Sequence, residues 1–143
     1  MRKWLSFLLA VALILCLTGC ANQEPKVWEW AQELKQEDII LAEPWRDDWE
    51  HIEMESLDDE DLSAFVMLLN ALNKDSFTKN KHLRGGTSTY GMKVAIGSEI
   101  YHIHEATGPH GALEMSYNGD LWWIDDEALS DFIQKVSDVE VME

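Results

Sequence analysis

Two histidines two positions apart form the clearest group of side chains that could do chemistry. His102 and His104 lie in residues 99–106, where apolar and polar residues alternate. On a strand both imidazoles would point to one face, about 6.5–7 Å apart at the backbone, which is close enough to bind one metal ion. Glu114 or His110 could add a third ligand, and zinc, copper or nickel accept these donors. The alternative is a solvated polar face without a metal.

Two hairpin turns determine which side chains would share a face with the histidines. Gly97-Ser98 would join residues 90–96 to 99–106, and Asn118-Gly119 would join 112–117 to 120–124. Because a two-residue turn fixes the register, one face is predicted to be apolar and to meet the helices. Its members are Tyr90, Met92, Val94, Ile96, Tyr101, Ile103, Leu113, Met115, Trp122 and Ile124. The opposite face carries Lys93, His102, His104, Glu114 and Trp123, and the last four of these converge if both hairpins share one sheet.

The same face allows two further interpretations. Trp123 could act as a platform on which a sugar ring stacks, although tryptophans more often contribute buried area to a core. Glu114 and His102 could form an acid and base pair, but nothing in the spacing requires one. The remaining cysteine and serine residues show no recognisable nucleophile motif. We therefore expect a binding module rather than an enzyme, with no cofactor unless the histidines hold a divalent metal.

The remaining pattern predicts the elements that position this face. Ser56 and the acidic residues after it are typical of a helix start, and apolar residues then recur at three- and four-residue steps to Leu72. Asp125 or Asp126 would cap a closing helix. Residues 27–34 could form a short helix. Residues 38–45 and 49–55 read as strands joined by a turn at residues 46–48, and the proline at position 44 suggests a strand edge or end.

These elements predict an α+β fold. About four strands would form an antiparallel meander, with further N-terminal strands as an option and with the helices packed on one face. A polar loop through Lys79, Lys81 and Arg84 would connect the first long helix to the meander. Residues 20–143 are long enough for one core and short for two, so residues 27–143 are predicted to form a single globular domain.

The N-terminus carries a motif of a different kind. Arg2 and Lys3 precede an apolar run that ends in Leu17-Thr18-Gly19-Cys20, and this arrangement resembles the signal peptide and lipobox of bacterial lipoproteins. The resemblance implies that residues 1–19 are removed, that Cys20 carries the lipid, and that residues 20–26 form a short tether. The protein would then be anchored to the outer face of the cytoplasmic membrane. The alternatives are a short membrane anchor, or an ordinary signal peptide in which Cys20 is incidental.

Charge limits the class of partner. Removal of Arg2 and Lys3 lowers the basic residues from 11 to 9, against 27 acidic residues, and gives a net charge of −18. Such a charge disfavours nucleic acid and leaves a protein partner at the cell envelope as the expectation. Residues 50–136, with Leu68-Leu69-Asn70-Ala71-Leu72 before the meander, are similar to small extracytoplasmic domains of Gram-positive lipoproteins of unknown function. That similarity implies no particular site.

Overall fold

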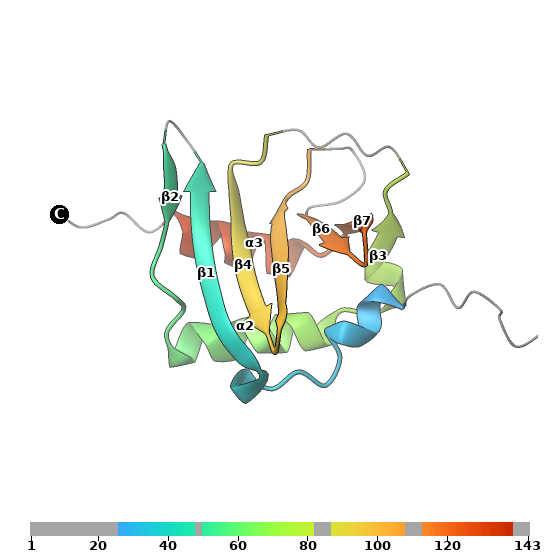
Figure 1. The fold of residues 1–143 in the computed structure, drawn as a ribbon, viewed down its shortest axis with the longest axis horizontal. Helices are drawn as coiled ribbons and strands as arrows, with labels where there is room; N and C mark the ends of the chain where they lie inside the picture. The colour runs from blue at the N-terminus through green and yellow to red at the C-terminus, as the bar shows by residue number, and fades with distance from the viewer. Residues whose placement is uncertain (1–25, 48–49, 82–86, 108–112, 139–143) are drawn as a thin grey trace, which may run out of the picture.

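A seven-stranded antiparallel sheet with the strand order β2-β1-β4-β5-β6-β7-β3 forms the framework of the protein (Figure 1). The computed structural model describes residues 26–47, 50–81, 87–107 and 113–138. The strands are β1 (Ile39–Asp47), β2 (His51–Glu53), β3 (Phe77–Lys79), β4 (Tyr90–Ile96), β5 (Glu99–Glu105), β6 (Leu113–Tyr117) and β7 (Asp120–Ile124). The helices are α2 (Asp59–Ala71) and α3 (Glu127–Ser137), with short 3₁₀ helices η1 (Val27–Trp30), η2 (Gln36–Asp38) and η3 (Lys74–Ser76).

The predicted α+β fold is confirmed, and so is the register of both hairpins. Met92 pairs with Ile103 in the first hairpin, and Met115 pairs with Trp122 in the second. Strands β5 and β6 also pair with each other, so that the two hairpins belong to one sheet. The apolar face predicted from this register forms the core together with apolar residues of both helices. The core residues with no exposed surface include Phe65, Leu69, Met92, Val94, Ile103, Leu113, Met115, Ile124, Leu129 and Ile133.

Several local predictions about the strands were wrong. Arg46 and Asp47 continue β1 rather than forming a turn, since they pair with Ile52 and His51 of β2. Residues 77–79 form the edge strand β3, which was predicted to be loop. Three residues are too few to show a period in the sequence, and only the pairing with β7 makes this segment a strand.

Pro44 lies inside β1, which is flanked by β4 along its length and by β2 near one end. Its carbonyl accepts a hydrogen bond from Met54 N–H at 2.9 Å, just beyond the last β1–β2 pair. The missing proline N–H therefore faces the end of β2 and removes no bond to β4. The expectation of an edge or end holds for this side of β1 only.

The helix starts were predicted with partial success. Asp58, not Ser56, caps α2, because the Asp58 carboxylate accepts from the N–H groups of Glu60 and Asp61 at 3.0 and 2.9 Å. The Ser56 hydroxyl instead bonds to the main chain of Ala42. Asp126 caps α3 by accepting from Leu129 N–H at 2.8 Å. The short helix expected over residues 27–34 is η1, which ends at Trp30.

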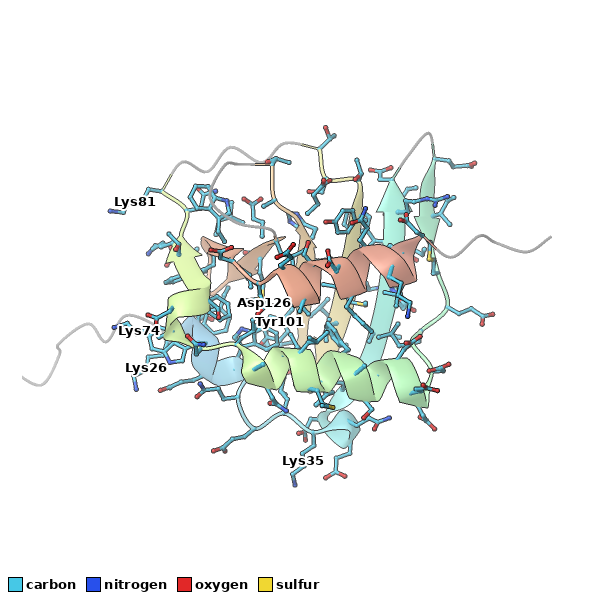
Figure 2. All side chains as sticks on the ribbon, turned by 180° about the vertical axis from the view of Figure 1, so that it is seen from behind. Lys26, Lys35, Lys74, Lys81, Tyr101 and Asp126 are labelled. Carbon is cyan, nitrogen blue, oxygen red and sulfur yellow. The ribbon has the colours of Figure 1, made fainter. Side chains whose placement is uncertain are left out.

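Both long helices pack on the same side of the sheet. Figure 2, which views the molecule from behind, shows α2 and α3 crossing in front of the strands, whereas in Figure 1 the strands lie nearest the viewer. In the part of the chain that the structure describes, no helix has the length and apolar character needed to cross a membrane.

The sheet face opposite the two long helices is called here the open face.

Candidate functional site

The open face carries all five residues that the hairpin register placed there. Lys93 of β4 pairs with His102 of β5, and His104 of β5 pairs with Glu114 of β6. Glu114 in turn pairs with Trp123 of β7. The predicted convergence therefore exists at the level of the backbone, but the side chains differ greatly in exposure and in hydrogen bonding.

Glu114 and Trp123 form a buried polar cluster with Asn80. Trp123 Nε1–H donates to Glu114 Oε2 at 3.0 Å, and Asn80 Nδ2 donates to the same oxygen at 3.2 Å. Glu114 is only 2% exposed and Trp123 only 8%. The expectation that Trp123 presents an open platform is therefore wrong. A buried carboxylate is stable only when hydrogen-bond donors compensate for its lost hydration, and here Trp123 and Asn80 are those donors.

His104 is held in one orientation by its neighbours. Its Nδ1 lies 2.8 Å from Ser88 Oγ and 3.1 Å from the carbonyl oxygen of Glu105. The Ser88 hydroxyl donates to that same carbonyl at 2.9 Å, so its proton is committed and Nδ1 must carry the imidazole proton. The network thus makes Nδ1 a hydrogen-bond donor and directs the other ring nitrogen, Nε2, away from Ser88.

His102 lies beside a cation. Lys93 Nζ donates to Glu43 Oε2 at 3.0 Å, and this hydrogen bond raises the pKa of Lys93. Partial burial lowers the pKa of His102, and the nearby charges of Lys93 and His104 lower it further. His102 is therefore a neutral imidazole at pH 7, able both to donate and to accept one hydrogen bond.

The metal prediction stays untested. Within the described residues, no three His, Cys, Asp or Glu side chains are grouped so that they could hold a metal ion. His102 and His104 do share a face, while Oε2 of Glu114 already accepts two hydrogen bonds. His110, the other third ligand considered, lies outside the described residues.

A shallow hollow on the open face was not predicted from the sequence. It has a volume of about 170 Å³, and Trp45 forms one of its walls. A Cβ atom added to Gly91 would lie 2.5 Å from Cζ2 of Trp45, so the indole rests directly on the Gly91 backbone. The residues that line this Trp45 hollow are Glu43, Pro44, Trp45, His51, Glu53, Lys93 and His102. A glycine inside a strand is the signal that could have indicated such a close approach.

A second, larger hollow opens between β5 and β6. These strands pair only where Ile103–Glu105 meets Leu113–Met115, and no pairing continues from there toward the two hairpin turns. The resulting β5–β6 gap has a volume of about 600 Å³. It is lined by Glu99, Ile100, Tyr101, His102, Ser116, Tyr117, Asn118 and Gly119. His102 lines both hollows, so the two meet at this residue.

The two neighbouring tryptophans of β7 allow a matched test of the buried cluster. Trp122 and Trp123 are 7% and 8% exposed, but in the described structure only Trp123 has a partner for its indole N–H. Trp123→Phe should reduce the free energy of unfolding by about 1–3 kcal/mol more than Trp122→Phe, because it leaves a buried carboxylate with one donor fewer. Urea unfolding of both variants measures this difference, and equal losses would contradict the assigned role.

The environment of His102 predicts its titration. Its NMR-detected pKa should lie below the ordinary imidazole value, and Lys93→Met should raise it by removing a neighbouring positive charge. Because the pKa is lowered in the folded state, the unfolded chain binds the proton first as the pH falls. The contribution of His102 to stability is therefore present above about pH 6.5 and is lost below it. A pKa unchanged by Lys93→Met would show that the lysine does not influence this imidazole.

Comparison with known proteins found no match for this chain among protein family models, curated proteins or solved structures. The chemistry of the open face therefore has to be interpreted from its own residues. Their arrangement offers two adjoining hollows with neutral imidazole, hydroxyl and amide groups, one lysine–glutamate pair and several aromatic rings.

Proposed function

We propose that the protein is an exported, lipid-anchored binding module that takes its ligand on the open face of the sheet. The observation that carries the binding role is the meeting of the Trp45 hollow and the β5–β6 gap at His102. The long helices cover one face of the sheet (Figures 1 and 2), and the Trp45 hollow lies on the other. Adjoining hollows lined by aromatic and hydrogen-bonding side chains are typical of ligand sites.

A binding role is favoured over catalysis because the polar groups on this face are already paired. Lys93 is held by Glu43, and Nδ1 of His104 by Ser88 and Glu105. Glu114 accepts two hydrogen bonds and is almost fully buried. A general base must reach the proton that it removes, and the buried Glu114 carboxylate does not present itself to a substrate in that way. These fixed groups instead make a rigid recognition surface.

The anchor is supported by the lipobox together with the place where the chain joins the core. Val27 and Ala31 have no exposed surface, so the polypeptide is fixed in the domain seven residues after Cys20. At about 3.3 Å per residue, the intervening tether spans on the order of 20 Å when extended. A lipid on Cys20 would therefore hold the binding face close to the membrane surface, within reach of envelope components.

The anchor can be tested with two cysteine variants of the full chain. Cys20→Ala should abolish incorporation of radiolabelled palmitate and release the protein from the membrane fraction, because the acceptor thiol is gone. Cys16→Ala is the matched control, since it removes the other cysteine but leaves the lipobox intact. Lipid labelling that survives in Cys20→Ala would overturn the anchor.

Transition-metal binding is the second candidate function. The network around His104 holds Nδ1 and orients Nε2 away from Ser88, and metal-ligating histidines usually have their other ring nitrogen hydrogen-bonded in this way. Titration calorimetry of the full chain with zinc, copper and nickel should give one-to-one binding that His102→Ala/His104→Ala abolishes. Glu60→Ala serves as the control, because it removes a possible ligand at an exposed position on α2, away from the open face. Absent binding, or binding that the double variant retains, would refute a histidine metal site.

A further inference from the structure

We infer that the β5–β6 gap binds an uncharged saccharide. The inference rests on the proposed function and deepens it, since it names the ligand class for one part of the open face. Three features of the gap support it: its shape, the chemistry of its polar groups and the aromatic side chains at its floor.

The shape of the gap favours a compact ligand over an extended chain. The strands β5 and β6 are joined at Ile103 and Met115, and they separate from that pair toward the turns at Gly97 and Asn118. The gap is therefore closed at one end within the sheet, so a peptide strand could not run through it between β5 and β6. Its volume of about 600 Å³ lies in the range of small-molecule sites.

The polar groups that line the gap suit hydroxyl groups. Ser116 contributes a hydroxyl, Asn118 an amide and His102 a neutral imidazole, each of which can donate and accept hydrogen bonds. Burial raises the pKa of Tyr101, and the neighbouring Tyr117 and Glu99 raise it further, so Tyr101 stays a neutral phenol. Glu99 is the only charged side chain among the residues that line the gap.

The aromatic side chains form a preorganised floor. The Tyr101 ring stacks on Trp30 of η1 with centroids 4.8 Å apart, and on Tyr117 of β6 with centroids 6.3 Å apart. Tyr101, labelled in Figure 2, belongs to the face that the helices cover, since it pairs with the buried Val94. The column thus backs the gap from the helix side. Rings already held in place lose little entropy when the C–H groups of a sugar pack against them.

Charge favours an uncharged ligand over an ionic one. The chain carries a net charge of −16, and a field of that sign repels anions from its surface. For a cation the gap offers one carboxylate, Glu99, beside uncharged hydrogen-bonding groups, which are the larger part of its polar lining. A carboxylate of this kind is well suited to accept hydrogen bonds from two neighbouring sugar hydroxyls.

NMR titration of the ¹⁵N-labelled full chain in detergent micelles tests this inference. The probes are glucose, galactose and N-acetylglucosamine, with glucosamine, glucuronate and tetra-alanine as charged and peptidic comparisons. An uncharged sugar should shift the amide signals of Ser116, Tyr117 and Gly119, with a Kd on the order of 1 mM. Ser116→Phe, which fills the gap from an exposed position, should weaken binding by about tenfold or more.

Two further variants keep the experiment decisive. Ser63→Phe makes the same change at an exposed site on α2 and should leave the affinity unaltered. Asn118→Gly removes the side-chain amide while tolerating the positive φ of 51° at this position, and should weaken binding by about threefold or more. It reports on the gap even if Ser116→Phe fails to fold.

Three results would overturn the inference, and a fourth would move the site. The three are no shift with any uncharged sugar at about 50 mM, equal affinity in Ser116→Phe and Ser63→Phe, and preference for a charged sugar or the peptide. A sugar that shifts Trp45 and His51 instead would also refute the gap as its site, but would leave the proposed binding face intact. The palmitate labelling of Cys20→Ala tests the anchor independently, so the two failures are distinguishable.

Discussion

The short pairing between β5 and β6 is the constraint on which the open face depends. Three residue pairs, Ile103–Met115, His104–Glu114 and Glu105–Leu113, join two locally formed hairpins into one sheet. This contact brings the histidine strand beside Glu114 and, through it, beside Trp123. Because the pairing stops after three residues, it also leaves the gap between the parts of β5 and β6 that lie next to their hairpin turns. One interaction thus both assembles the face and leaves the larger of the two hollows described here.

The rest of the face is kept rigid by buried or paired polar groups. The Glu114 carboxylate satisfies Trp123 and Asn80 at one end, and the Lys93–Glu43 ion pair links β4 to β1 at the other. Hydrogen bonds of this kind add little net stability, but breaking one in a buried place is costly. Because Glu114 and Lys93 are already held by these bonds, they are less available than His102 to bond with a ligand. His102 lines both hollows, so a ligand in either one could contact it.

The aromatic residues have roles that their number alone does not reveal. Trp45 rests on the backbone of Gly91, Trp30 stacks on Tyr101, and Trp123 is a hydrogen-bond donor within a buried cluster. Trp30 also ties η1 to the sheet, because its ring stacks on Tyr101, which lines the gap. If Cys20 is lipidated as proposed, Trp30 of this column lies ten residues after the anchor along the chain.

The sequence by itself determined what depends on near neighbours in the chain. A two-residue turn imposes a register, so the pairing of Met92 with Ile103 and the division into two faces could be predicted. The cap of α3 was equally local: the sequence limited it to Asp125 or Asp126, and in the structure it is Asp126. The tertiary structure alone decided the edge strand β3, the burial of Glu114 and Trp123, the contact of Trp45 with Gly91 and the extent of β5–β6 pairing. Each of these depends on segments distant in sequence, and no periodicity within one segment records which other segment will cover it or where their pairing ends.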